Sequence, residues 1–330
     1  MESKKESYPS HLAYSSSLST SSSDEIDFRE LFTELWKGKW IIIISTFVFA
    51  VGSVLYSLSL SNIYKADILL APAESSSGGN LSNMAGQLGG LAALAGVNLG
   101  GAELSQADLA VQVMRSRQFI EGGFIDKHNL LIPLMAAKDW DLAKDELILD
   151  DEIYDQSSEK WLRKPEGLRG SKPTAQEAYD VFRNETFSVA QNKETNLYTI
   201  TVKHYSPYIA QKWVNWLIED INSVMRERTI AEASQNLAYL NIQLQKTAVA
   251  EMQSTFYKLI EEQTKRLMLA EVQDEFVFKT IDPAVAPEVK DGPSRAIICM
   301  LGTIFGGLIG IAIVFLRFIL KKNTNNNISD

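Results

Sequence analysis

The chain has 330 residues and a net charge of −9, from 32 basic and 41 acidic side chains. A hydrophobic content of 45% matches that of globular proteins and excludes a disordered chain. One cysteine excludes an intramolecular disulfide framework and a zinc site built from several thiolates. The acidic balance argues against nucleic acid as a partner.

Two stretches of the sequence, 40–64 and 296–316, contain no charged residue. A bilayer core needs about 20 apolar residues in a helix, so each stretch is long enough to span it. A cleaved signal peptide does not fit the first stretch, because a mostly polar segment precedes it and no small-residue cleavage site follows. We therefore predict transmembrane helices at 40–61 and 296–317.

The basic residues next to these two stretches set the expected orientation. The residues concerned are Arg29, Lys37, Lys39, Arg317, Lys321 and Lys322. The positive-inside rule places both flanks, and so both termini, in the cytoplasm. The loop 61–295 holds 24 of the 32 basic and 33 of the 41 acidic residues, hence the whole net charge. We expect a protein of the cell inner membrane with its bulk in the periplasm.

The segments 1–39 and 75–101 each allow two interpretations. The first is serine-rich and then carries apolar residues at helical spacing, at Phe28, Leu31, Phe32, Leu35 and Trp36. This pattern indicates either an amphipathic helix on the inner leaflet or an extension of the first spanning helix. The second segment, rich in Ser, Gly, Ala and Leu, is either a flexible loop or a patch that packs against a partner.

The exported part alternates between strand and helix patterns. Strands are expected at 63–70, 187–190, 197–204 and 275–282. Helical segments are expected at 106–121, around 124–129 and 140–147, and through 183 after the T-x-x-E capping pattern at Thr174–Glu177. Strands from distant parts of the chain should meet in one sheet, giving an α+β base.

One stretch, 208–282, contains neither Gly nor Pro and follows a Ser206–Pro207 helix start. Its composition favours helix. A single helix from Pro207 to about Asp274 would extend about 100 Å. Its apolar stripe would exceed what a small base domain can cover, so we expect it to pack partly on local helices and partly on the same helix in adjacent subunits.

Motifs that carry catalysis or bind cofactors are absent from the sequence. It contains no Walker A loop, H-E-x-x-H or G-x-S-x-G motif, and its three histidines (His11, His128 and His204) are far apart. The acidic run Asp150–Glu152 lacks the spacing of a calcium loop and indicates a solvated face. We expect no enzyme activity, no cofactor and no metal.

A proline–glycine pattern near the C-terminus carries a family resemblance. It comprises Pro283, Pro287 and Pro293, followed by Gly302, Gly306, Gly307 and Gly310. Small residues four apart let helices approach closely in lipid. The spacing of Pro287, Pro293, Gly306, Gly307 and Gly310 resembles the motif of the Wzz family of polysaccharide co-polymerases. The segments DEIDFRELFTELWKGKW and IYKADILLAP are also similar to Wzz proteins.

The resemblance implies a non-enzymatic regulator of polysaccharide chain length, such as that of lipopolysaccharide O-antigen. It further implies a bell-shaped homo-oligomeric ring, expected to be octameric, that acts with a Wzy-type polymerase on a growing lipid-linked polysaccharide. Inner membrane lipids would surround the spans. The prolines would hold an extended segment between the bell and the membrane.

Three alternatives remain open on the sequence alone. The chain could be an export co-polymerase or adaptor that works with a separate tyrosine kinase, a two-span receptor, or a structural scaffold.

We expect seven regions in chain order. The first four are a cytoplasmic tail (1–39), a first span (40–61), the first part of the base (62–205) and a long helix (206–273). The last three are a base strand with the proline segment (274–295), a second span (296–317) and a second cytoplasmic tail (318–330).

Overall fold

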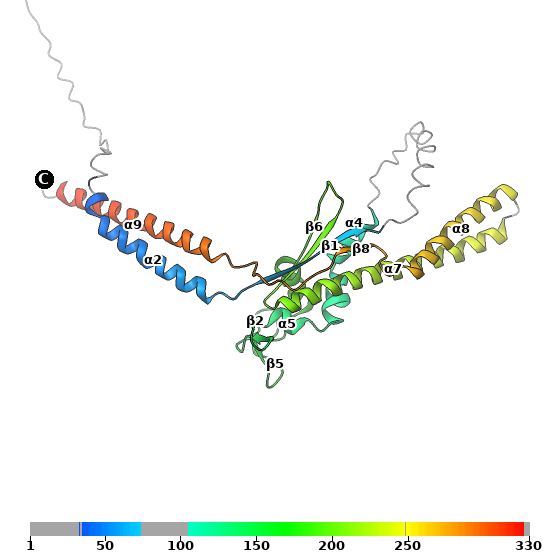
Figure 1. Ribbon diagram of the computed structural model, residues 1–330, viewed down its shortest axis with the longest axis horizontal. Coiled ribbons are helices and arrows are strands. Elements are labelled where there is room, and N and C mark those ends of the chain that lie inside the picture. The colour runs from blue at the N-terminus through cyan, green and yellow to red at the C-terminus, as the bar shows by residue number, and fades with distance from the viewer. Residues whose placement is uncertain (1–32, 34, 74–104, 248, 327–330) are drawn as a thin grey trace, which may run out of the picture. The chain divides into compact units, whose positions relative to one another are not determined.

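The structure is a computed structural model, described here for residues 33, 35–73, 105–247 and 249–326. The chain divides into two compact units (Figure 1). One comprises residues 58–294, and the other combines residues 1–57 with residues 295–330.

A four-stranded antiparallel sheet forms the centre of the 58–294 unit. Its strand order is β6-β7-β1-β8, so segments far apart in the sequence pair with one another (Figure 1). The strands are β1 (Tyr64–Pro72), β6 (Phe187–Gln191), β7 (Tyr198–His204) and β8 (Phe278–Asp282). The prediction that distant strands share one sheet is confirmed.

The alternation of side chains explains how this sheet acquires a core. Along β1, Ala66, Ile68 and Leu70 are buried, as their period-2 spacing predicts. In β7, Ile200 and Val202 lie in the same core. The first half of helix α7 (Pro207–Lys246) packs on β1 and β7 and brings Trp213 into this core.

Short helical elements complete the core. They are α4 (Gln106–Met114), η1 (Phe119–Asp126), α5 (Leu131–Met135), α6 (Ala175–Val181) and η2 (Phe182–Thr186), of which η1 and η2 are π-helices. The prediction of one helix over 106–121 is therefore wrong, because the chain turns after Met114 and restarts at Phe119. At α6 the predicted capping box is confirmed, with Glu177 N donating to Thr174 Oγ1 and Thr174 N to Glu177.

Two small antiparallel ribbons occupy residues 137–161, formed by β2 (Ala137–Asp141) with β3 (Glu146–Leu149) and β4 (Tyr154–Asp155) with β5 (Lys160–Trp161). The helix predicted at 140–147 is thus a β-hairpin. Local polar chemistry explains the difference: Asp141 accepts a hydrogen bond from Ala143 N, and Asp145 adopts a positive φ of 54°. Both features favour a turn over a helix.

The predicted single helix between Pro207 and Asp274 is also wrong. The chain instead forms a helical hairpin of α7 and α8 (Ala250–Val272), with Thr247 and Val249 in extended conformation between them (Figure 1). Arg226 binds Asp274 and Asn236 binds Gln263, so the two helices are antiparallel. A straight helix would hold its ends far apart, whereas β7 and β8 belong to one sheet and require the chain to return.

The second unit is a pair of antiparallel apolar helices, α2 (Lys39–Ser59) and α9 (Arg295–Asn326) (Figure 1). Both α2 and the Arg295–Leu320 part of α9 are long and apolar enough to cross a membrane. They begin within one residue of the predicted spans at 40–61 and 296–317. The amphipathic pattern around Phe28–Trp36 and the segment 75–101 lie largely or wholly outside the described residues.

Candidate functional site: the proline segment and the glycine-lined helix pair

The three prolines of the motif lie in the segment 283–294, which follows β8 and has no helix or strand of its own. Near its start, Gln211 of α7 donates from Nε2 to the carbonyl oxygen of Ala284, at 2.8 Å. Pro283 is exposed, and Pro287 and Pro293 are half-buried. Proline fixes φ and cannot donate a backbone hydrogen bond, so this composition favours an extended connection.

The end of the proline segment pairs with the residues that follow α2. Ile63 N donates to Gly292 O at 2.9 Å, and Asp291 N donates to Ile63 O at 2.8 Å. Lys203 at the end of β7 forms an ion pair with Asp291 at 2.8 Å. The two chain segments that lead to the two apolar helices are therefore joined to each other and to the sheet.

Three motif glycines line the contact between α9 and α2. A Cβ atom added to Gly306 would lie 2.6 Å from Phe49 Cβ, and one added to Gly310 would lie 2.8 Å from Ile42 Cα. A Cβ at Gly302 would overlap Ser53. Ser45 on α2 donates from its hydroxyl to Gly306 O at 2.9 Å. These glycines let the two helices of one chain approach closely, as small residues do in membranes.

Gly307 differs from the other motif glycines. An added Cβ there would meet only Thr46 Oγ1, at an ordinary contact distance of 3.6 Å. The structure therefore separates the glycines that the sequence grouped together. The sequence did contain the signal, because Gly302, Gly306 and Gly310 share the four-residue spacing and Gly307 does not.

The sequence does not predict a buried ionic cluster that the structure shows in the 58–294 unit, because His128 is far from its partners along the chain. Asp220 of α7 is only 4% exposed, and its carboxylate binds Lys127 Nζ at 2.5 Å and His128 Nε2 at 2.8 Å. The His128 ring stacks on Trp216, with centroids 4.1 Å apart. The partners are 92 residues apart in the sequence, so only the fold brings them together. The cluster joins the end of η1 to α7.

His204 at the end of β7 is a structural residue. Its Nε2 lies 3.0 Å from Pro133 O and its Nδ1 accepts a hydrogen bond from Ser206 N at 3.1 Å, which fits the neutral ring. Burial lowers the pKa of His204 to about 4. Protonation would place an N–H group on Nδ1, facing the N–H of Ser206, and the two donors would repel each other. His204 therefore stabilises the β7–α7 junction only in its neutral form.

Glu177 fixes the chain at the start of α6 through hydrogen bonds and ion pairs. Its carboxylate accepts two hydrogen bonds of 2.9 Å from Arg163, and Arg169 lies 3.3 Å away. The hydrogen bonds from Arg163 lower the pKa of Glu177 to about 2, against the opposing effect of burial. This geometry is that of a fixed structural carboxylate rather than a proton donor.

Within the ranges that the structure describes, no group of three His, Cys, Asp or Glu side chains is placed to hold a metal ion. Of the acidic run 150–152, Asp151 and Glu152 are exposed and Asp150 pairs with Lys138 at 3.4 Å. What these parts of the chain define is a protein with an α+β unit and a close apolar helix pair.

Comparison with known families adds a specific relationship. A family model described as Wzz, chain length determinant protein, matches residues 24–126. Both N-terminal segments that resemble Wzz proteins lie within this match, and the proline–glycine motif lies outside it. The match therefore confirms, from a different part of the chain, the resemblance to the Wzz family of polysaccharide co-polymerases.

Two solved structures are similar to this chain at low identity. A full-length bacterial polysaccharide co-polymerase shares 13% identity, with 90% of this chain and 99% of that chain covered and a TM-score of 0.37. A fragment of WzzB, a polysaccharide co-polymerase from Salmonella Typhimurium, shares 10% identity, with 70% and 100% covered and a TM-score of 0.26. No curated protein matches the chain.

Proposed function

We propose that this chain is a polysaccharide co-polymerase that sets the length of a cell-surface polysaccharide, such as lipopolysaccharide O-antigen, without forming glycosidic bonds itself. The observation that carries the proposal is the Wzz family match over residues 24–126. The paired apolar helices and the motif glycines between them support it. A Wzy-type polymerase would supply the catalysis, with the growing lipid-linked polysaccharide as the shared substrate.

In this proposal α2 and α9 span the inner membrane, both termini lie in the cytoplasm, and the 58–294 unit lies in the periplasm. The basic residues outside each apolar stretch support this orientation. The pairing of Ile63 with Gly292 holds the two connections to the helices at one place on the unit, which supports both helices entering the same membrane from one side. Both connections are short, since Ile63 follows Ser59 closely and Arg295 follows Gly292.

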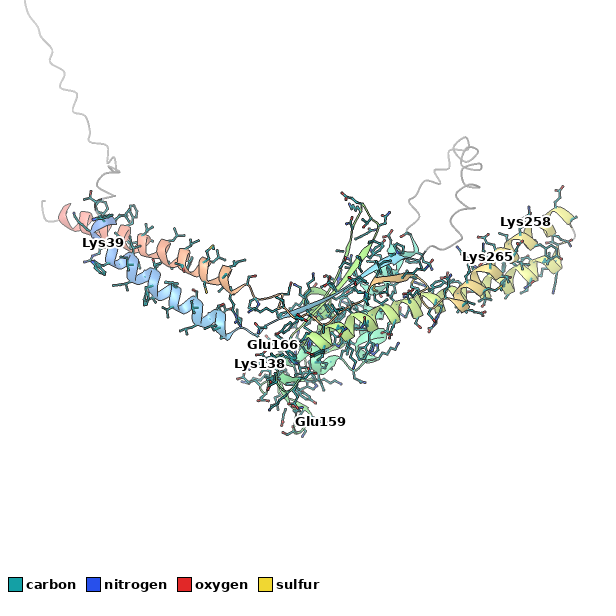
Figure 2. All side chains as sticks on the ribbon, in the orientation of Figure 1. Lys39, Lys138, Glu159, Glu166, Lys258 and Lys265 are labelled. Atoms are coloured by element: carbon teal, nitrogen blue, oxygen red, sulfur yellow. The ribbon has the colours of Figure 1, made fainter. Side chains whose placement is uncertain are left out.

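We further propose that the α7–α8 hairpin is the surface for homo-oligomerisation. The expected assembly is a ring of eight subunits. Beyond the part that packs on the sheet, the hairpin exposes large apolar side chains. They include Tyr239, Ile242, Met252, Tyr257, Met268 and Val272. Lys258 and Lys265 lie among them on α8 (Figure 2). An apolar surface of this kind on a slender hairpin supports contact with neighbouring subunits.

The test is the polysaccharide ladder of a strain that lacks the gene. We expect loss of a preferred chain length, and its return when the full chain is supplied from a plasmid. A normal ladder in the deletion strain would contradict the proposal and favour a structural scaffold. Loss of all polymer, rather than of length control, would also contradict it, because that result indicates a role in bond formation or export.

A further inference from the structure

Aromatic and apolar side chains are exposed on the 58–294 unit near the start of β1. The Trp140 ring, in the β2–β3 ribbon, packs edge-on against Tyr64, with centroids 5.7 Å apart, and against Tyr208 near the start of α7, at 6.0 Å. Tyr208 is 53% exposed, and Leu142, in the turn that follows β2, is 78% exposed. These four residues form one surface, called here the aromatic ribbon surface.

Two backbone and side-chain donors of this turn have partners within the ribbon. Trp140 Nε1 donates to Asp145 Oδ1 at 3.0 Å, and Ala143 N donates to Asp141 Oδ1 at 2.8 Å. Moving the turn from water into a less polar layer therefore does not leave these two donors unpaired. The charges of Lys144 and Asp145 limit how deep the turn can go, because a charged group is costly in the hydrocarbon core.

The covalent chain keeps this surface close to the ends of the two apolar helices. α2 has 21 residues, so it is about 31 Å long and matches a bilayer core, with Ser59 at one boundary. Tyr64 follows Ser59 by five residues, which can span at most about 18 Å. Gly292, hydrogen-bonded to Ile63, precedes Arg295 of α9 by three residues, or at most about 11 Å. These limits hold for any orientation of the 58–294 unit.

The composition of the surface matches the boundary of a membrane. Tryptophan and tyrosine are enriched where the hydrocarbon core meets water, because each combines an apolar ring with a polar atom. The proline segment adds Val289, which is 79% exposed. Val289 lies near the same connection, since the next residue, Lys290, donates from Nζ to Asn62 Oδ1 at 3.1 Å. Separate segments of the chain thus expose side chains suited to this boundary within chain reach of it.

We propose that the aromatic ribbon surface docks onto the lipid headgroup layer of the bilayer that α2 and α9 span, with Leu142 at the edge of the hydrocarbon core. This contact limits the tilt of the 58–294 unit against the membrane, in addition to the two short connections. The inference rests on the membrane topology of the proposed function, and it adds the surface that the lipid covers.

The test attaches an environment-sensitive dye to single cysteines of the full chain in vesicles of phosphatidylethanolamine and phosphatidylglycerol. The native cysteine is removed by Cys299→Ser, and the dye is attached to Leu142→Cys. Lipids that carry a nitroxide on the headgroup or in the acyl chain quench the dye at short range. We expect the headgroup nitroxide to lower the fluorescence at position 142 by about 2-fold or more, because the interfacial layer is only about 5–8 Å thick.

Two other exposed leucines provide matched controls. Leu308→Cys lies in the apolar part of α9, where acyl-chain nitroxides should quench the dye if α9 spans the membrane. Leu259→Cys lies on α8, where neither nitroxide should quench it. One turn further along α8, Gln263 accepts a hydrogen bond from Asn236. Asn236 is 28 residues, or about 42 Å, along α7 from Tyr208.

Quenching at position 308 without quenching at position 142 would overturn the docking and leave the membrane topology intact. Absence of quenching at both positions would contradict the topology and the docking with it. A dye at position 142 that neither the nitroxide lipids nor iodide on both sides of the vesicle membrane can quench would show that a second copy of the chain covers this surface. That result, or equal quenching at positions 142 and 259, would also overturn the proposal. The ladder of the deletion strain reports separately on chain-length control.

Discussion

At the scale of single residues, His204 shows how burial sets a protonation state. The ring is enclosed at the β7–α7 junction and both nitrogens are used in the neutral form. In the unfolded chain the same ring titrates near 6.5. The folded chain therefore binds a proton at His204 only at lower pH, near 4.

This difference predicts how stability depends on pH. Between about pH 6.5 and pH 4 the unfolded chain carries more protons at this residue, so stability falls as the pH falls through that window, by up to about 3 kcal/mol. The contribution is fully present above the window. His204→Gln keeps a side-chain donor without titrating. Thermal unfolding from pH 4.5 to 7.5 should show a flatter dependence for the variant, and equal slopes would contradict the assignment.

The motif glycines make a second prediction at this scale. Gly306→Ala places a Cβ 2.6 Å from Phe49 Cβ and should push α9 away from α2. The same change at the adjacent Gly307 meets an ordinary contact and is the matched control. The single cysteine, Cys299, is half-buried on α9 and can report helix separation.

We expect a thiol-reactive dye to label Cys299 faster, and at a lower temperature on heating, in Gly306→Ala than in the wild type. Gly307→Ala should label as the wild type does. Identical labelling of the two variants would show that Gly306 does not determine the close approach of the helices.

At the scale of elements, the hairpin depends on a side chain that fixes its return to the sheet. Asn222 of α7 is buried and accepts hydrogen bonds from Val277 N at 2.8 Å and Phe278 N at 3.0 Å. It also donates to Phe278 O at 3.1 Å. Asn222 thus pairs with the start of β8 much as a neighbouring strand would.

Replacing Asn222 should therefore cost more than one hydrogen bond. In Asn222→Ala, buried backbone groups of residues 277 and 278 lose their partner, and we expect a loss of about 2–4 kcal/mol in stability. Asn215→Ala on the same helix is the control, with an expected loss below about 1 kcal/mol. Denaturant unfolding of the detergent-solubilised chain measures both. A loss equal to the control would mean that β8 docks without this contact.

Side chains also occupy the two outer edges of the sheet. On β6, Arg115 donates to Val189 O at 3.2 Å, and on β8, Glu275 accepts from Thr280 N at 3.0 Å. Occupied edge groups disfavour pairing with strands of other chains. This supports the proposal that subunits meet at the helical hairpin rather than at the sheet edges.

At the scale of the whole molecule, the proline segment is the last part of the unit built on the sheet, and α9 follows it directly in the sequence. Replacing both Pro287 and Pro293 with alanine should increase the number of backbone conformations that this extended segment can adopt. The connection between the unit and α9 should then be less rigid. We expect the modal length of the polysaccharide to shift. Pro165→Ala, in an exposed loop, is the control and should leave it unchanged.

The measurement is the ladder of a deletion strain that carries each variant at matched protein levels. An unchanged modal length in the double variant would count against a role for the prolines in chain-length control. A changed length in the Pro165→Ala strain would show that the readout lacks specificity for the motif.

The sequence by itself determined the features that depend on local spacing. Uncharged stretches located α2 and α9, alternation located β1 and β7, and the T-x-x-E pattern located the start of α6, because each pattern repeats within a few residues. The glycine spacing identified the residues that line the helix contact. The Wzz resemblance also came from local motifs.

Tertiary structure decided what depends on partners far apart in the chain. Local composition favoured one long helix over 207–274, but β8 must pair with β1 in the sheet that holds β7, so the chain has to turn near Thr247. Asp220 contacts His128 across 92 residues, and Lys172 lines a cavity together with Glu121. No sequence spacing predicts either of these two arrangements. Such contacts are set by the packing of whole elements. The net charge of −9 is a sum over the whole chain, so it does not indicate which residues are in contact.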